Sequence, residues 1–311
     1  MQAPQKRPGT LSPIELRGVR IVVKPTFLIV GAQKAGTTSL YSAMRQHPHI
    51  GRANKKELHF FDRFYHRGMA WYEKQFRVEA QHVQVGESTP VYMYDELVRG
   101  RIARDLPDIK ILAILRDPVA RAYSHFWHSR RFDQESASSF EEALAVEPQR
   151  LEEIREQIRQ PDANGCEGWT YPKVRRSYWW SYADRGRYVA QLEDLERLFG
   201  RDRILVLTLE ETKQNPEQQI SAALEHIGVD PALHGEYELP RRNTYSKISR
   251  QETRRLREEG KSIPSEATDG SYPPIQPATR EKLMDEFAEH DIRLKKWLSR
   301  GALPWQSRAN D

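Results

Sequence analysis

Cysteine is nearly absent from this chain: Cys166 is the single one among 311 residues. One cysteine cannot form an intramolecular disulfide, and it cannot build a zinc site from several thiolates. The sequence also lacks any apolar run near the roughly 20 residues of a membrane-spanning helix. We therefore expect a protein without a membrane span and, by default, a cytoplasmic location.

A large excess of charge of one sign is also missing. The 49 basic and 44 acidic residues leave a formal net charge of +5. Because the basic residues are dispersed, we expect no nucleic-acid partner, whereas an anionic cofactor or an acidic substrate fits the balance. No metal-ligand cluster is evident, so no metal is expected. We interpret residues 1–20 as a disordered lead-in, 21–300 as one domain and 301–311 as a C-terminal tail.

Runs of strand type alternate with helical patterns along the domain. Strands are predicted at 26–30, 82–86, 110–115 and 204–209, with a further strand followed by a loop in 55–62. Helices are predicted at 38–46, 69–76, 95–105, 119–131, 140–159, 188–199, 217–227 and 281–298, the highly charged 140–159 on the surface. The alternation predicts an α/β, P-loop-like fold in three layers, with a central parallel sheet flanked by helices.

The loop between the first strand and the first helix has the composition of an anion site. Gly31 and Gly36 bound it, Lys34 lies inside it, and Thr37 and Thr38 follow. Its amides, its lysine and the partial positive charge of the helix N-terminus all favour a phosphate. A Walker A loop has its lysine directly after the second glycine, where this chain has Thr37. The loop therefore predicts phosphate binding rather than ATPase chemistry, and an ordinary strand–helix turn is the alternative.

A second strand end carries a basic residue. Arg116 follows the apolar strand 110–115, and Ser124 lies on the next helix. Together they are suited to a second phosphate. The structural alternative is that Asp117 caps the helix and Arg116 forms an ion pair.

Both elements, in this order, resemble the sulfotransferases that use 3′-phosphoadenosine 5′-phosphosulfate (PAPS) and release 3′-phosphoadenosine 5′-phosphate (PAP). In that family the first loop binds the 5′-phosphosulfate and the later strand and helix bind the 3′-phosphate. The resemblance implies that the C-terminal loop around 241–247 closes over the cofactor. The implied cofactor-binding residues are Gln33, Lys34, Ala35, Gly36, Thr37, Thr38, Ser39, Arg116, Ser124, Tyr188, Arg242 and Lys247.

The segment 55–62, Lys-Lys-Glu-Leu-His-Phe-Phe-Asp, narrows the resemblance. It is similar to the acceptor-site segment of heparan sulfate 3-O-sulfotransferases and related N-sulfotransferase domains. That similarity implies that Glu57 is the catalytic base, assisted by Lys34 and surrounded by Lys56, His59 and Asp62. Ser88 stands where those enzymes commonly carry a lysine near the acceptor. With no anchor and no second cysteine, we interpret the chain as a soluble, prokaryotic relative whose acceptor need not be a glycosaminoglycan.

The chemistry fits these residue types. Transfer of a sulfuryl group to a hydroxyl needs a base for the acceptor proton and cations near the leaving phosphate. A glutamate is a weak base, so we expect burial beside Phe60 and Phe61 to raise the pKa of Glu57. His59 is the rival base, although we favour a hydrogen-bonded supporting role for it. The alternative for Glu57 itself is an ion pair on the surface.

Other functions stay open at this point. A nucleotide kinase or NTPase with an atypical P-loop is one, and a nucleotide-binding protein without catalysis is another. The aromatic cluster of Tyr178, Trp179, Trp180 and Tyr182 is either core or a stacking surface, and Arg175 with Arg176 fits an acidic acceptor. The predicted partner is a small-molecule or glycan acceptor, of unspecified identity, and the oligomeric state is open.

Overall fold

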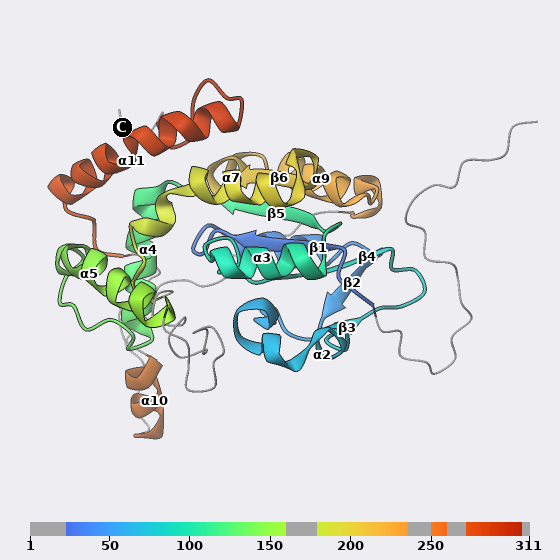
Figure 1. Ribbon diagram of the computed structural model, residues 1–311, viewed down its shortest axis with the longest axis horizontal. Coiled ribbons are helices and arrows are strands. Elements are labelled where there is room, and N and C mark those ends of the chain that lie inside the picture. The colour runs from blue at the N-terminus through green and yellow to red at the C-terminus, as the bar shows by residue number, and fades with distance from the viewer. Residues whose placement is uncertain (1–22, 160–178, 236–249, 260–271, 307–311) are drawn as a thin grey trace, which may run out of the picture.

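The computed structural model describes residues 23–159, 179–235, 250–259 and 272–306 (Figure 1). The predicted lead-in 1–20 lies outside these ranges. So do Cys166, Tyr178 and the basic residues singled out in the sequence at Arg175, Arg176, Arg242 and Lys247.

A six-stranded sheet forms the centre, in the order β3-β2-β4-β1-β5-β6. The strands are β1 (Phe27–Gly31), β2 (Ile50–Ala53), β3 (Phe76–Arg77), β4 (Gln84–Ser88), β5 (Lys110–Leu115) and β6 (Ile204–Thr208). Neighbouring strands are parallel except β2 and β3, which pair antiparallel. Every residue of β1 is buried, because this strand lies between β4 and β5 and has helices on both faces.

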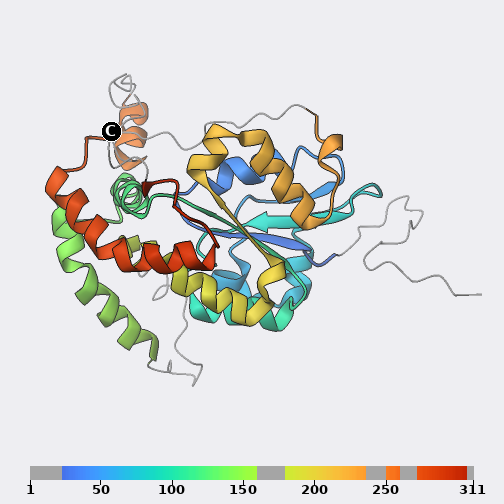
Figure 2. The ribbon, with the colours of Figure 1, turned by 90° about the horizontal axis from the view of Figure 1, so that it is seen from above.

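Helices cover both faces of the sheet. α1 (Thr37–Met44) and α9 (Pro216–Ile227) pack together on one face, and α3 (Glu96–Asp105) and α7 (Tyr188–Phe199) pack together on the other (Figure 2). The long α11 (Pro277–Trp297) packs on α7, and α4 (Pro118–Arg131) and α5 (Phe140–Arg159) stand beside one end of the sheet (Figure 1). Shorter helices are α2 (Met69–Glu73), α8 (Leu209–Gln214) and α10 (Arg250–Glu258). The predicted three-layer α/β fold is confirmed.

One predicted strand is wrong. The segment 55–62 contains no strand; β2 ends before it, and a π-helical turn begins at Phe60. His59 has φ 52°, a left-handed conformation that a strand cannot contain. The backbone N–H groups of Phe60 and Phe61 donate to the hydroxyl of Tyr92 at 2.9 and 3.4 Å instead of to a neighbouring strand.

Two segments are more buried than their sequences suggest. α5 was predicted on the surface, but Phe140, Ala143, Leu151 and Ile154 on one side of it are buried. Residues 301–306, predicted to begin a C-terminal tail, pack on the domain: Leu303 and Trp305 are buried, and the Trp305 indole N–H donates to Asp291 at 2.8 Å.

Candidate active site

Four parallel strands end at the same edge of the sheet, where ligands of open α/β folds bind. β1 leads into the glycine-bounded loop, and β5 leads to Arg116. β4 ends at Ser88, and β2 leads into the segment that carries Glu57. Residues far apart in the sequence therefore meet at one site.

The loop after β1 presents the open end of a helix. α1 begins at Thr37, and its N-cap is Gly36 with φ 99°, so no side chain caps the first turn. Glycine is favoured there because other residues adopt this conformation only with strain. An uncapped helix start attracts an anion through its backbone N–H groups and its dipole. The residues predicted to bind the cofactor lie at this helix start. Ala35 and Thr37 are buried, and Thr38 and Ser39 are half-buried in the first turn.

Lys34 adds a full positive charge to this loop. Its backbone φ of 72° is left-handed, a conformation that costs a non-glycine residue about 1–3 kcal/mol. Burial, with Arg116 and Arg131 nearby, lowers the pKa of Lys34 to about 8. The ammonium nitrogen lies 3.4 Å from Nδ1 of His128 on α4. Sequence reasoning missed His128, whose only signal was its place one helical turn beyond Ser124.

Arg116 is tied to the same loop. Its Nη1 donates to the backbone oxygen of Lys34 at 3.1 Å, so the two basic residues from β1 and β5 form one unit. Tyr188 donates its hydroxyl to the backbone oxygen of Arg116 at 2.9 Å and is itself buried. Asp117 caps α4 by accepting from the N–H of Val119 at 3.0 Å. The capping role offered above as the alternative for Asp117 is therefore confirmed. Tyr188 thus lies beneath Arg116 and supports it.

Ser124 occupies the predicted place on α4 but is buried. Its hydroxyl is 2.9 Å from the hydroxyl of Tyr272. A phosphate contact at Ser124 therefore requires Tyr272 to share or release this hydrogen bond.

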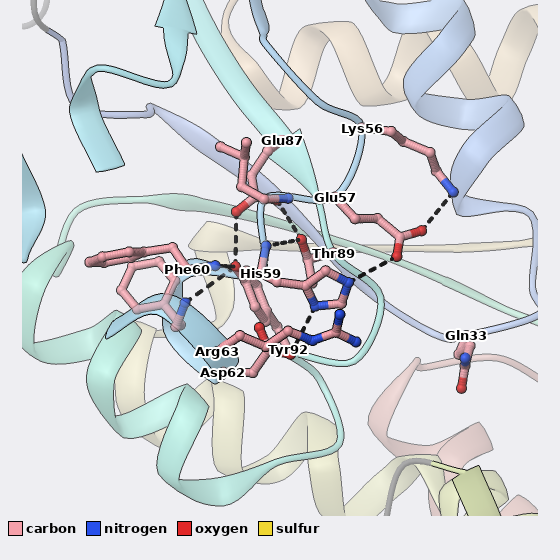
Figure 3. Close-up of polar contacts among 12 residues, drawn as sticks. Gln33, Lys56, Glu57, His59, Phe60, Asp62, Arg63, Glu87, Thr89 and Tyr92 are labelled. Carbon is pink, nitrogen blue, oxygen red and sulfur yellow. Dashed lines mark hydrogen bonds and ion pairs between the residues drawn. The ribbon is translucent and has the colours of Figure 1, made fainter. Parts of the chain in front are cut away.

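Opposite the loop, a chain of charged side chains surrounds Glu57 (Figure 3). Lys56 donates to Oε1 of Glu57 at 2.7 Å, and Nε2 of His59 lies 3.3 Å from Oε2. Nδ1 of His59 lies 2.8 Å from Oδ2 of Asp62. Asp62 is buried and is also 3.4 Å from Nε of Arg63. His59 therefore bridges two carboxylates and orients the partly buried one, Glu57.

The sequence predicts a raised pKa for Glu57, and this prediction is wrong because the pKa is lowered. Burial does favour the neutral acid, but the hydrogen bonds from His59 and Lys56 outweigh it and lower the pKa of Glu57 to about 2. The rings of Phe60 and Phe61 are both buried in the core. Burial alone would lower the pKa of His59, but the hydrogen bonds with Asp62 and Glu57 outweigh it and raise this pKa to about 9. With this pKa, His59 is protonated near neutral pH and lies within ion-pair distance of both carboxylates.

A buried carboxylate beneath this segment was not anticipated. Glu87 on β4 has no exposed surface and accepts hydrogen bonds from the hydroxyls of Tyr72 and Tyr92 at 2.9 and 3.0 Å. It also accepts from the Thr89 hydroxyl at 2.5 Å and from the Leu58 N–H at 3.1 Å. Burial raises the pKa of Glu87. The sheet thus holds the backbone next to Glu57 through one carboxylate.

Replacing Glu87 with alanine should destabilise the protein by about 3–5 kcal/mol, because it leaves several buried donors without an acceptor. Denaturant unfolding followed by circular dichroism measures this. The same substitution at the exposed Glu79 should change stability by less than about 0.5 kcal/mol. A loss at Glu87 no larger than at Glu79 would show that this network does not anchor the segment.

The remaining predictions concern Ser88 and the aromatic residues Trp180 and Tyr182. Ser88 is fully buried at the end of β4, so the structure does not open it to an acceptor. Trp180 and Tyr182 belong to a second apolar cluster with Phe126 and Phe140, which supports the core interpretation of the aromatic residues.

The described residues hold neither a membrane-spanning helix nor a cluster of metal-binding side chains. None of the helices described is long and apolar enough to span a bilayer. Within the same ranges, no group of three or more His, Cys, Asp or Glu side chains is arranged to hold a metal ion.

The known proteins with similar sequences include sulfotransferases. The chain is 28% identical over 301 residues to the bifunctional heparan sulfate N-deacetylase/N-sulfotransferase 3 of Homo sapiens, which covers 91% of this chain and 31% of the relative. It is 32% identical over 157 residues to the membrane-associated sulfotransferase kil1 of Dictyostelium discoideum, 48% of this chain and 32% of that protein. The chain thus spans about a third of the length of these relatives.

A solved structure and a family match extend over most of the chain. A sulfotransferase from Alicyclobacillus acidocaldarius superposes with a TM-score of 0.65 at 26% identity, covering 92% of this chain and all of the other. The sulfotransferase domain family matches residues 24–283, which include the glycine-bounded loop, Glu57 and Arg116. The chain therefore belongs to the sulfotransferase domain family.

Proposed function

We propose that this protein transfers the sulfuryl group of PAPS to an acceptor hydroxyl, with Glu57 as the base. The observation that carries the proposal is the pairing of a cationic loop with an ionised carboxylate. Lys34 and Arg116 are joined through the Lys34 backbone, and Glu57 lies close enough to Lys34 to affect its pKa. Such a site binds an anionic donor on one side and accepts a proton on the other.

The residues fit a donor with phosphate at both ends. The uncapped start of α1 and Lys34 suit the 5′-phosphosulfate, and Arg116 suits the 3′-phosphate. In the reaction the acceptor oxygen bonds to sulfur while the bond from sulfur to the 5′-phosphate oxygen breaks. The hydroxyl proton passes to the Glu57 carboxylate, and PAP leaves with the electron pair of the broken bond. Lys34 stabilises the negative charge that develops on the leaving oxygen.

Near the base, the side chains suit a polar acceptor. Lys56 places positive charge beside Glu57, Arg63 places positive charge beside Asp62, and both basic side chains are partly exposed. We propose that the acceptor is a carbohydrate, because the relatives named above include a bifunctional heparan sulfate N-deacetylase/N-sulfotransferase. Labelled PAPS with panels of glycans, lipids, natural products and peptides tests this choice, and labelling of a different class alone would reject it.

A kinase or NTPase is not favoured. Thr37 occupies the place of the Walker lysine, and the lysine of this loop comes two residues before Gly36, at Lys34. A binding protein without catalysis would bind PAP and transfer nothing to any acceptor in the screen.

Calorimetry separates these functions directly. We expect PAP to bind without magnesium and ATP to bind far more weakly. Arg116→Ala should weaken PAP binding about tenfold to a hundredfold, because a hydrogen-bonded charge contributes about 1.5–3 kcal/mol. Arg104→Ala, at an exposed position on α3, is the matched control and should bind PAP as the unchanged protein does. Magnesium-dependent ATP binding without PAP binding would contradict the proposal.

A further inference from the structure

Behind the loop lies a buried arginine that the sulfuryl-transfer proposal does not use. Arg185, in the short 3₁₀ turn Asp184–Gly186, is 3% exposed. Its Nη1 donates to Oε1 of Gln33, the residue that precedes Lys34. Its Nε donates to the Ser181 hydroxyl at 2.7 Å, and its guanidinium stacks on the Tyr94 ring at 4.7 Å. Three contacts therefore fix the plane of this guanidinium.

The turn that carries Arg185 is itself held firmly. The backbone N–H groups of Ala183 and Asp184 each donate to the carboxylate of Glu147 at 2.9 Å. Tyr94 donates its hydroxyl to Asp184 at 2.5 Å. A side chain at Gly186 would have its Cβ 2.6 Å from the Phe287 ring, so the turn lies directly against α11. Arg185 thus reaches the loop from a rigid base.

A guanidinium has only donors, so it selects one orientation of the Gln33 side chain. The amide oxygen must face Arg185, and the amide nitrogen with its two N–H groups must occupy the other branch. Gln33 is partly exposed and directly precedes Lys34 in the sequence, and no described residue accepts a hydrogen bond from its nitrogen. Without Arg185 the amide could rotate and present its oxygen, which repels an anionic ligand.

We propose that Arg185 is a positioning residue that holds the Gln33 amide nitrogen toward the oxygens of the transferring sulfuryl group. The inference rests on the proposed use of PAPS. Gln33 is on the strand side of Lys34, whereas the phosphate-binding helix start lies on the far side at Gly36. Gln33 therefore meets the sulfuryl group and contributes little to the phosphate.

The test compares the affinities of PAPS and PAP, which differ by the sulfuryl group, so it needs no acceptor. In Gln33→Leu the PAPS Kd should rise about tenfold while the PAP Kd stays within about twofold. Arg185→Met should produce the same selective loss, and the double variant should lose no more than either single one, because Arg185 acts through Gln33. Gln81→Leu, at an exposed position, should leave both affinities unchanged.

Two further variants separate positioning from structural support. Arg185→Lys keeps a donor for Gln33 and should recover part of the PAPS affinity lost in Arg185→Met. Gln33→Glu keeps an acceptor for Arg185 but has no N–H to offer, so it should weaken PAPS at least as much as Gln33→Leu without lowering the melting temperature. This variant gives an answer even if Arg185→Met does not fold.

Three outcomes would overturn the inference: equal losses of PAPS and PAP, additive losses in the double variant, or full PAPS affinity in Gln33→Glu. Failure of the proposed function looks different, because the unchanged protein would then either bind neither nucleotide or bind them and transfer nothing to any acceptor.

Discussion

Glu57→Gln should lower the rate of sulfuryl transfer by about 10²–10⁴-fold while PAP still binds. Glutamine has nearly the shape of glutamate and can still accept from Lys56, so the segment should keep its place. It cannot take the acceptor proton. Activity is measured with labelled PAPS and the best acceptor from the screen, and PAP binding by calorimetry.

The low pKa of Glu57 makes the pH dependence informative. With a pKa of about 2, the carboxylate is ionised throughout the working range, so no acid limb from Glu57 is expected between pH 5 and 7. Glu79→Gln, an exposed substitution of the same kind, should leave the rate unchanged. Transfer that survives Glu57→Gln would make His59 the leading base, although its pKa of about 9 keeps it protonated near neutral pH.

Sequence reasoning succeeded where the signal is local. A buried strand that runs into a glycine-bounded loop and a helix predicted both β1 and α1, and the apolar run of β5 predicted the position of Arg116. Because carboxyl ends of parallel strands meet at one edge, these two elements alone were enough to predict an anion site there, and that site stays a prediction.

Sequence reasoning failed where an irregular local backbone, or side chains from distant segments, determine the outcome. The pKa of Glu57 depends on how His59 bridges to Asp62, and that bridge follows from a left-handed residue and a π-helical turn that no periodicity predicts. The role of Glu87 depends on hydroxyls and an N–H from four separate residues. Contacts of this kind need the fold before they can be seen.

Lys34→Met should reduce both donor binding and transfer. We expect PAP to bind about tenfold to a hundredfold more weakly at pH 7, because a charged hydrogen-bond donor is lost. The transfer rate should fall by about 10²–10³-fold, as when a group that stabilises the leaving charge is removed. Methionine keeps much of the side-chain volume, so the loop should still pack. Lys74→Met, at an exposed position, is the matched control.

The pH dependence of PAP binding identifies Lys34 as the cause. Its pKa is lowered to about 8, so the ammonium is charged near pH 7 and loses its proton as the pH rises through 8. Affinity for PAP should therefore be constant near pH 7 and fall above pH 8, by up to about tenfold per pH unit. In Lys34→Met the fall above pH 8 should disappear. If the fall persists in that variant, another group controls binding and Lys34 does not contact the donor as its position indicates.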